Sequence, residues 1–354
     1  MQVGLDVTPA VTAKAGLARY AEQLWRELVR RDDVEVHAFA LGRGPDGDFG
    51  LPLTRRHLPL RALQPIWRAL RWPRAETFAG DVDVVHTIAL TPIPTRKPQV
   101  VTIHDMLPIT HAELYPPGAD EGQRAELAEA ARARVLVTTC EATADEIVRV
   151  AGFPRERIVI ARPGVLPPHG DAPLPVEPPF ILAVGQVTPR KGFDVIAEAA
   201  AHLGERSPPV VLAGPDWWRS EDIRRRIAQV DAHRRVRLLG PVDDATLASL
   251  YRAATIVCHA SRGEGFGMTC LEAMAFGRPV VATDLPSVRE LAGGAVELVP
   301  VDDAEATAEA LRGLLDDEER RRALGEAARK RAAEFSWKRM AADVVEAYRL
   351  ALAA

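Results

Sequence analysis

The sequence contains little cysteine and no long apolar run. Its three cysteines, Cys140, Cys258 and Cys270, are far apart and odd in number. With no Cys-x-x-Cys pair and no Cys/His cluster, neither a disulfide framework nor a zinc site is predicted, and we expect buried thiols in a reducing compartment. No run approaches the ~18 apolar residues of a membrane span, and the opening VGLDVTP resembles a strand rather than a signal peptide. We therefore expect a cytoplasmic protein.

The sequence has no large excess of either charge: 45 basic and 49 acidic residues give a formal charge of −4. This balance does not indicate a nucleic-acid partner. Lysine is scarce: only five of the 45 basic residues are lysines, which makes Lys191 conspicuous. The 354 residues, 47% hydrophobic and 27% charged, are typical of a globular protein of about two domains.

Short apolar runs alternate along the chain with segments of helical periodicity. The runs are nearly continuous rather than alternating, as expected for strands buried on both faces of a parallel sheet, and the helices between them complete βα units. Predicted helices include Leu17–Arg30, Leu247–Ala253 and Trp337–Ala353. The predicted strands are Val3–Val7, Val34–Ala40, Val82–His86, Val100–Ile103, Val135–Thr139, Ile158–Ala161, Phe180–Val184, Val210–Ala213, Val236–Leu239, Ile256–His259, Val280–Ala282 and Ala295–Leu298.

A proline-rich segment, Arg162–Pro179, interrupts this pattern. Seven prolines in its eighteen residues cannot continue a helix or a central strand, so the segment is predicted to be a linker. It divides the chain into two α/β domains, residues 1–165 and 178–336.

The densest functional signal is the segment Ser261–Val281, SRGEGFGMTCLEAMAFGRPVV, which follows a predicted strand. Its alternating glycines, Gly263, Gly265 and Gly267, allow a sharp turn and a close backbone approach to a ligand. A helix is predicted to begin near Met268, so its free N–H groups and positive dipole end favour an anion, most naturally a phosphate.

Two carboxylates with seven residues between them stand in this segment, Glu264 on the loop and Glu272 in what we expect to be the first helical turn. A carboxylate can accept two hydrogen bonds from neighbouring hydroxyls, so Glu272 suits a ribose and Glu264 suits the hydroxyls of a sugar. The alternative for Glu272 is that it only complements the helix dipole.

A second signal is Val184–Phe193, VGQVTPRKGF, in which a predicted strand ends at Gly185 and a loop presents Arg190 and Lys191 before a helix. Ligands of open parallel sheets bind beyond the carboxyl ends of strands. An adjacent Arg and Lys there would neutralise a diphosphate, although a solvated basic pair is the simpler alternative.

The first half carries weaker signals. His104 and Asp105 end the strand VVTI, and Gly16 lies in the loop after the first strand, where it would let the chain approach a ligand. His104 has a structural alternative, since a lone histidine is more often structural than catalytic. No G-x-G-x-x-G follows the first strand, which argues against a dinucleotide-dependent oxidoreductase.

Together these segments resemble the GT4 family of retaining glycosyltransferases, in its mannosyltransferase-like form, over nearly the whole chain. EGFG…LEAMAFGRPVVA is similar to the family's E-x7-E region, VGQVTPRKGFD to its phosphate-binding loop, IHD to its first-domain His segment, and FSWKRMAADVVEAY to its closing helix. Thr269, Cys270 and Glu141 depart from the residues common in the family. The resemblance implies a GT-B fold: two Rossmann-like domains with parallel sheets facing across a cleft, and a C-terminal helix, 337–354, crossing back to the first domain.

The resemblance also implies roles on the donor side. Arg190 and Lys191 would hold the diphosphate and stabilise it as a leaving group, without a metal. Glu272 would bind the ribose, and Glu264 would contact the donor sugar.

Backbone groups complete the implied donor site. The amides of Gly265, Phe266, Gly267 and Met268 would fix the sugar and phosphate. The turn Gly240–Asp243, with Val242, would meet the base. Gly185 and Gly16 would border the nucleotide sugar, and His104 would sit near the anomeric carbon.

The implied reaction is transfer of a hexose, with mannose as the candidate, from a nucleotide-diphosphate sugar to a hydroxyl acceptor by front-face attack with retention. A GDP-sugar is favoured over a UDP-sugar, no cofactor is expected, and the acceptor is a glycan, a lipid-linked or a small-molecule hydroxyl. Two alternatives stay open: a nucleotide-sugar 2-epimerase or hydrolase of the same fold, and a non-catalytic nucleotide-binding homologue.

The segment Arg55–Ala75 is not explained by a donor site, since it holds six arginines and two tryptophans and no acidic residue. An amphipathic helix with Trp67 and Leu70 packed into the first domain is the expected structure. The alternative is a surface that contacts an anionic lipid at the inner face of the membrane, or a charged acceptor.

Overall fold

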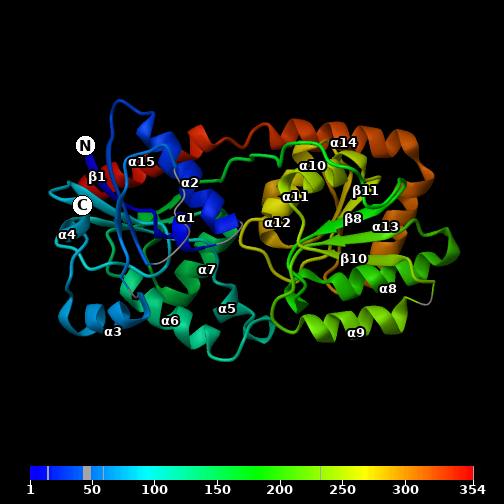
Figure 1. Ribbon diagram of the computed structural model, residues 1–354, viewed down its shortest axis with the longest axis horizontal. Helices are drawn as coiled ribbons and strands as arrows, with labels where there is room; N and C mark the ends of the chain where they lie inside the picture. Colours follow the sequence, from blue (N-terminus) through cyan, green and yellow to red (C-terminus); the bar gives the residue numbers. More distant parts are fainter. Residues whose placement is uncertain (14–15, 43–48, 59, 232, 354) are drawn as a thin grey trace. The chain divides into compact units, whose positions relative to one another are not determined.

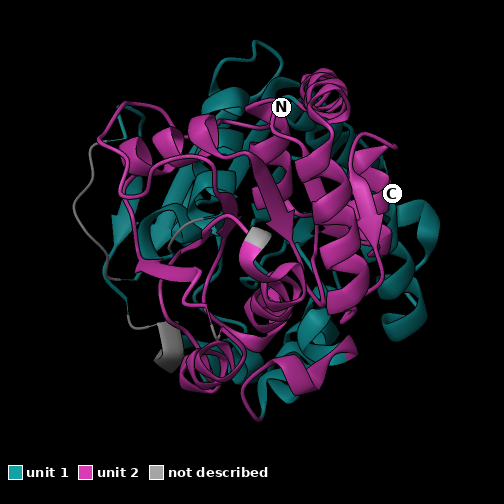
Figure 2. Ribbon diagram, turned by 90° about the vertical axis from the view of Figure 1, so that its right-hand side faces the viewer, with its two compact units in different colours: residues 1–109, 118–164, 336–354 teal, residues 110–117, 165–335 magenta. Residues whose placement is uncertain are grey.

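The computed structural model describes residues 1–13, 16–42, 49–58, 60–231 and 233–353, without the side chains of 60–62 and 206. Two compact units are present (Figure 2): unit 1 comprises residues 1–109, 118–164 and 336–354, and unit 2 comprises residues 110–117 and 165–335. Residues 110–117, which the sequence places within the first domain, group with unit 2. Each unit is built on its own parallel sheet (Figure 1).

The sheet of unit 1 has the strand order β3-β2-β1-β4-β5-β6-β7, with every ladder parallel. β3 was not predicted, because its three residues, Thr-Arg-Arg, carry no apolar run and lie at the sheet edge. The strands are β1 (Gln2–Asp6), β2 (Glu35–Leu41), β3 (Thr54–Arg56), β4 (Val84–Thr87), β5 (Gln99–Ile103), β6 (Val135–Thr138) and β7 (Ile158–Ile160).

The sheet of unit 2 is also wholly parallel, in the order β10-β9-β8-β11-β12-β13. Its central strands are fully buried, which explains their unbroken Val/Ile/Leu/Ala sequences. The strands are β8 (Ile181–Val184), β9 (Val210–Ala213), β10 (Val236–Gly240), β11 (Ile256–His259), β12 (Val280–Thr283) and β13 (Glu297–Val299). All twelve predicted strands are therefore present, with ends shifted by up to two residues.

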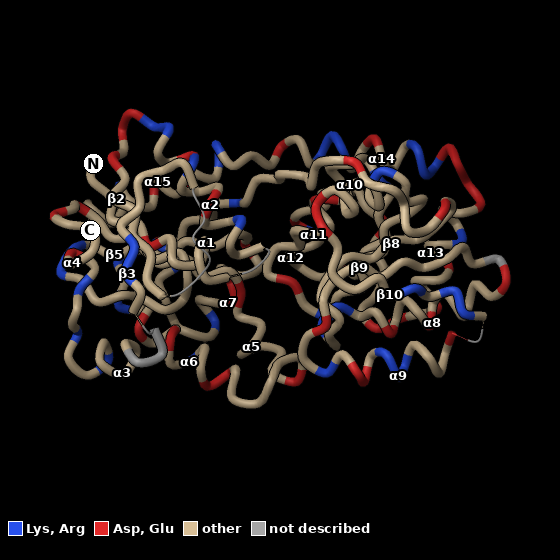
Figure 3. The backbone as a smooth tube through the Cα atoms, viewed as in Figure 1, with Lys and Arg blue, Asp and Glu red and all other residues tan. Residues whose placement is uncertain are grey.

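Helices connect the strands and cover both sheets. Before the linker they are α1 (Thr8–Thr12), α2 (Gly16–Val29), α3 (Leu60–Leu70), α4 (Glu76–Ala79), α5 (Leu107–Thr110), α6 (Ala119–Ala130) and α7 (Glu141–Ala151). After it they are α8 (Phe193–Leu203), α9 (Ser220–Val230), α10 (Asp244–Ala253), α11 (Met268–Ala275), α12 (Pro286–Ala292), α13 (Ala304–Asp316), α14 (Glu318–Ala332) and α15 (Trp337–Ala353). Residues 162–179 contain neither helix nor strand, as their prolines predicted. Figure 3 shows acidic and basic residues interspersed along α9 and α14, as expected for solvated helix faces.

The last helix, α15, returns to unit 1 and packs on α2 and β6, which confirms the predicted crossing. Its buried Tyr348 hydroxyl lies 2.8 Å from His86 Nδ1, and His86 Nε2 lies 2.8 Å from Thr102 Oγ1. Burial lowers the pKa of His86 to about 3, so this histidine is neutral and ties the helix to the sheet. Helical spacing in the sequence predicts Leu352 on one apolar stripe with Val344 and Tyr348, but the helix end leaves Leu352 41% exposed.

Each sheet has one point where the strand order reverses. In unit 1 the chain runs outward from β1 through β3 and then outward on the other side from β4, so β1 and β4 are neighbours at the reversal. In unit 2 the same relationship holds between β8 and β11. The loops leaving the carboxyl ends of these strand pairs diverge to opposite sides, which opens a ligand site at each reversal.

The three cysteines are buried thiols, as predicted. Within the described residues, no helix combines the length and the apolar character that crossing a membrane requires. In the same residues, no group of three or more His, Cys, Asp or Glu side chains is arranged to hold a metal ion.

Candidate active site

The loop that leaves β8 carries Arg190 and Lys191 on a single 3-10 turn, Pro189–Lys191. Gly185 lies directly after the strand, and a Cβ added there would approach the Lys191 Cε to 3.0 Å. Glycine at this position therefore leaves room for the lysine stem to return across the strand end. The Lys191 ammonium is buried, with the side chain 9% exposed, so it does not behave as a solvated surface charge.

A close backbone approach fixes this turn against the loop that leaves β11. Gly192 has φ +62°, and a Cβ there would lie 1.9 Å from the Ala260 carbonyl oxygen, so only glycine allows the contact. Arg262 then spans the two loops: its Nη1 and Nη2 bind both carboxylate oxygens of Asp194, at 3.0 and 2.8 Å. The bidentate pair holds the start of α8 beside the glycine-rich loop.

Glu264 lies at the centre of the site. Its Oε1 accepts hydrogen bonds from Lys191 Nζ at 2.5 Å, Ser261 Oγ at 2.7 Å and Arg190 Nη1 at 3.2 Å. His259 Nε2 lies 3.5 Å from the same oxygen. Among the described residues every one of these contacts goes to Oε1, so Oε2 keeps its lone pairs for a ligand.

Burial and neighbouring charges act in opposite directions on the pKa values of Glu264 and Lys191. Burial alone would raise the pKa of Glu264, but Lys191 and Arg190 outweigh it and hold that pKa well below its usual range. Burial lowers the pKa of Lys191, and Glu264 opposes the decrease. The two cations and one carboxylate therefore carry a net positive charge at neutral pH, which a diphosphate would complement.

The helix that follows the glycine-rich loop starts at Met268, as predicted, with Gly267 in the left-handed region at φ +99° as its N-cap. Glu272 is the fifth helical residue, so the expectation that it lies in the first turn is wrong. It is 7% exposed, and its Oε2 accepts a hydrogen bond from Tyr251 Oη at 3.2 Å. Tyr251 stacks on Phe276 with ring centroids 5.2 Å apart, so the carboxylate is held rigidly rather than left at the helix surface.

Sequence reasoning missed His259, although it lies inside the strand-to-loop segment that carried the main signal. Its ring is 5% exposed, with Nδ1 3.3 Å from Thr269 Oγ1 and Nε2 directed at Glu264. Burial lowers the pKa of His259 to about 4, so the ring is neutral; Nδ1 is hydrogen-bonded to Thr269, and Nε2 forms no hydrogen bond with the described residues. Tyr251 was missed as well, because nothing in the sequence pairs it with Glu272.

The other predicted backbone contacts of unit 2 lie on loops at the carboxyl edge of its sheet. Phe266 packs edge-on against Phe335, with ring centroids 5.8 Å apart, and fixes the loop between Gly265 and Met268. Val242 lies between β10 and α10, two residues after Gly240, where Asp243 caps the helix by accepting from Thr246 N at 2.8 Å. Both loops leave the carboxyl ends of strands, where ligands of open parallel sheets bind.

The predicted residues of the first half belong to unit 1. His104 Nε2 lies 2.8 Å from the Ile88 carbonyl oxygen, which can only accept, so the proton of a neutral ring is on Nε2 and the lone pair on Nδ1. The ring packs edge-on against Tyr20, and burial lowers its pKa. Gly16 is the exposed first residue of α2, with open space where a Cβ would lie, so no close approach requires glycine there. The two residues before it lie outside the described part of the chain.

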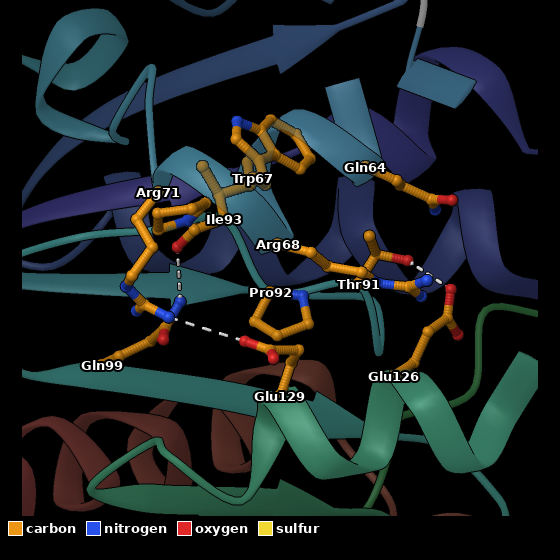
Figure 4. Close-up of a pocket in the computed structure, with 11 residues that line it drawn as sticks. Gln64, Trp67, Arg68, Arg71, Thr91, Pro92, Ile93, Gln99, Glu126 and Glu129 are labelled. Atoms are coloured by element: carbon orange, nitrogen blue, oxygen red, sulfur yellow. Dashed lines mark hydrogen bonds and ion pairs between the residues drawn. The ribbon is translucent and has the colours of Figure 1, made fainter. Parts of the chain in front are cut away.

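The arginine-rich segment begins in β3 and continues into α3 and the turn after it; residue 59 lies outside the described residues. Trp67, labelled in Figure 4, packs in the core, and its Nε1 donates to the Pro73 carbonyl at 3.0 Å. The expectation that Leu70 packs beside it is wrong: Leu70 is 71% exposed because it lies at the solvent side of the helix end. Trp72 is 62% exposed next to it.

The chain has two doubly wound parallel sheets. At the switch point of the second lie Arg190 and Lys191 (the Arg–Lys cradle) and the two glutamates, Glu264 and Glu272. These features define the GT-B class of glycosyltransferases. Residues 169–331 match the family described as glycosyl transferases group 1, and residues 15–169 match Glycosyltransferase Family 4. The chain belongs to the group 1 glycosyltransferases.

Relatives support this assignment. A D-inositol 3-phosphate glycosyltransferase of Nocardia farcinica is 32% identical over 334 residues, 85% of this chain and 73% of that protein. One of Xylanimonas cellulosilytica is 35% identical, over 71% of this chain and 66% of its own length. A phosphatidyl-myo-inositol mannosyltransferase of Mycolicibacterium smegmatis is 37% identical over half of this chain and 48% of that protein.

Solved structures show the same fold. Sucrose-phosphate synthase of Thermosynechococcus elongatus matches with a TM-score of 0.78 at 21% identity, covering 99% of this chain and 98% of that one. WaaG, a glycosyltransferase involved in lipopolysaccharide biosynthesis, matches with a TM-score of 0.72 at 18% identity, covering 98% and 99%.

Proposed function

We propose that this chain transfers a hexose from a nucleotide-diphosphate sugar to a hydroxyl acceptor, with retention of the anomeric configuration and without a metal. The observation that carries the proposal is the buried cluster of Arg190, Lys191 and Glu264 at the β8/β11 switch point. A buried lysine and a partly buried arginine beside Glu264 are suited to a diphosphate. In this role they stabilise the charge that develops as the diphosphate leaves.

In the proposed step, the bond between the anomeric carbon and the diphosphate oxygen breaks, and its electron pair goes to the diphosphate. The acceptor oxygen forms the new bond on the same face of the sugar, and its proton goes to a leaving phosphate oxygen. Arg190 donates bidentately and Lys191 supplies a point charge. The N-terminal amides of α11 bind the same anion through the helix dipole.

The two glutamates take different parts of the donor. Glu272, held by Tyr251, is buried and rigid as a receptor for the ribose diol must be, because an ordered carboxylate loses little entropy on binding. Glu264 offers Oε2 to the sugar hydroxyls while its Oε1 stays with the cations. Its position therefore ties sugar recognition to the diphosphate cradle.

Mannose from a GDP-sugar is our candidate donor, supported by the mannosyltransferase named among the relatives. A thermal-shift panel of GDP, UDP, ADP and dTDP tests the base, since a ligand that binds the folded state raises the melting temperature. We expect the largest shift with GDP, and a larger shift with UDP would contradict the choice of base.

Incubation with radiolabelled GDP-mannose, with and without a hydroxyl acceptor, separates the proposed transfer from its alternatives. A labelled glycoside formed only with the acceptor supports transfer. Free sugar, or an epimer formed without any acceptor, would indicate the epimerase or hydrolase. Binding without turnover would indicate the non-catalytic homologue.

We also propose peripheral contact of a cytoplasmic protein with an anionic membrane through α3 and the turn after it. Leu70 and Trp72 are exposed beside Arg68 and Arg71, so apolar side chains and positive charge share one surface segment. Sedimentation with phosphatidylglycerol vesicles tests this. Leu70→Ser with Trp72→Ser should reduce binding, while Leu352→Ser, at a leucine of unit 1 that is 41% exposed, should not.

A further inference from the structure

A cavity of about 170 Å³ lies in unit 1, at the switch point between β1 and β4. The Arg190–Lys191–Glu264 cluster lies at the corresponding switch point of the sheet in unit 2. Open parallel sheets bind ligands at such switch points. A water occupies about 30 Å³ in the liquid, so the cavity has room for one small ring rather than for an oligosaccharide. Its polar wall residues are Asp6, Thr8, Thr12, Gln64 and Thr91.

The threonine hydroxyls of this wall have already donated their hydrogens. Thr8 Oγ1 donates to Asp6 Oδ1, Thr12 Oγ1 donates to the Thr8 carbonyl at 2.9 Å, and Thr91 Oγ1 donates to Glu126 Oε1 at 2.8 Å. The hydroxyl oxygens of Thr12 and Thr91 can therefore only accept hydrogen bonds from a ligand. The wall is therefore rich in hydrogen-bond acceptors.

Asp6 adds to this acceptor character. It ends β1, is 4% exposed, and receives both the backbone N–H and the hydroxyl of Thr8 on Oδ1. Burial raises its pKa to about 6, so at pH 7 and above it is a buried carboxylate, and none of the described residues forms an ion pair with it. None of the described residues that line the cavity is Lys, Arg or His.

The remaining wall is apolar and rigid. The Trp67 ring is held by the hydrogen bond of its Nε1 to Pro73, and Ile93 lies beside it. Gln64 and Trp67 come from α3, and Thr91 and Ile93 from the segment after β4; Figure 4 labels these four residues in a neighbouring pocket that they also line. An aromatic ring facing polar acceptors suits a ligand with one C–H face and several hydroxyls at its edge.

We propose that this cavity is the acceptor pocket and that it selects an uncharged cyclic polyol over a phosphorylated one; the inference rests on the proposed transfer function. Each ligand hydroxyl brings the donor that Asp6, Thr12 and Thr91 lack, and the C–H face packs on Trp67. A phosphate brings only acceptors and negative charge, which would face a buried carboxylate at a large desolvation cost. Gln64, with an amide that both donates and accepts, fixes the orientation of the ring.

Calorimetry on the full chain tests this with four ligands: methyl α-mannopyranoside, myo-inositol, mannose 6-phosphate and myo-inositol 1-phosphate, each with GDP present. We expect the two uncharged rings to bind at least tenfold more tightly than their phosphates. Asp6→Asn keeps an acceptor for Thr8 but places a donor in the wall, so it should weaken the uncharged rings at least tenfold. Gln64→Ala, a substitution that favours the helix, should also weaken them, and Asp81→Asn, at an exposed carboxylate of unit 1, should not.

The outcomes separate the pocket from the proposed function. Tighter binding of the phosphates, or unchanged polyol binding in both Asp6→Asn and Gln64→Ala, would overturn the pocket while nucleotide binding and transfer still stood. Absence of nucleotide binding in the unmodified chain would overturn the proposed function itself. The nucleotide affinity of Asp6→Asn should equal that of the unmodified chain, since Asp6 belongs to unit 1 and the cradle to unit 2.

Discussion

Lys191 Nζ lies 2.5 Å from Glu264 Oε1, and both side chains are 9% exposed. This pair joins the two loops that leave β8 and β11, so the residue proposed to hold the diphosphate and the residue proposed to hold the sugar share one contact. Binding of the donor must therefore redistribute charge between them.

Replacing Lys191 by alanine should lower kcat/KM by roughly 10²-fold or more, the scale of removing one preorganised charge from a transition state. Arg190→Ala should behave similarly. Steady-state kinetics with GDP-mannose measure both, and circular dichroism checks that the fold is kept. Activity within threefold of the unmodified chain in both variants would remove the cradle from the mechanism.

The metal-independent mechanism predicts that EDTA leaves the rate of transfer unchanged. The positive charge at the leaving group then comes from Arg190 and Lys191. Rates are compared before and after chelation and again after adding Mg²⁺. Loss of activity with EDTA and its return with Mg²⁺ would refute this part of the proposal.

The two glutamates should separate in binding experiments. Glu272→Ala should weaken GDP binding by about 1–3 kcal/mol, the range for lost hydrogen bonds to a charged group. Glu264→Gln should leave GDP binding intact or strengthen it, because Lys191 and Arg190 lose a competing anion, yet turnover should fall. Calorimetry with GDP and then kinetics with the intact donor decide this. Equal losses of GDP affinity in the two variants would contradict the assignment.

His104→Ala should retain GDP affinity and lose most transfer activity, if His104 meets the anomeric carbon as the family resemblance implies. Its neutral ring, with the proton fixed on Nε2 by Ile88, presents a lone pair on Nδ1. Calorimetry with GDP and steady-state kinetics with GDP-mannose measure the two effects. A variant with unchanged kcat would exclude His104 from the mechanism.

Asp6→Asn should stabilise the protein at neutral pH and not at pH 4. Burial raises the pKa of Asp6 from 3.8 to about 6, so between these values the folded state binds more protons than the unfolded state and stability falls as pH rises. A shift of this size corresponds to about 3 kcal/mol of unfolding free energy at pH 7, which the amide would recover. Urea unfolding at pH 4 and pH 7.5 measures it; an equal effect at both pH values would argue against a charged Asp6.

Much of the fold could be predicted from the sequence because parallel βα units have a strong local signature. Strands buried on both faces must be apolar throughout, and the prolines of the linker cannot join either sheet. The predicted start of α11 at Met268 was correct for the same local reason, since Gly267 provides the left-handed residue that begins the helix. The prediction that Leu70 packs in the core was wrong, and Leu352 is exposed although it lies on the predicted apolar stripe. Helical spacing shows which residues share a face, but it does not show that the end of the helix extends beyond the core on which that face packs.

The sequence by itself determined the residue types of the donor cradle, Arg190, Lys191 and the two glutamates, because charged residues at strand ends can be recognised locally. The contacts that these residues make depend on the tertiary structure. It brought Glu264 onto Lys191, placed Tyr251 on Glu272, and enclosed Asp6 with Trp67 in a cavity. These pairs are separated by many residues in the chain, and they meet because the strand order reverses at β1/β4 and β8/β11, a property of hydrogen bonding between strands that no local pattern records.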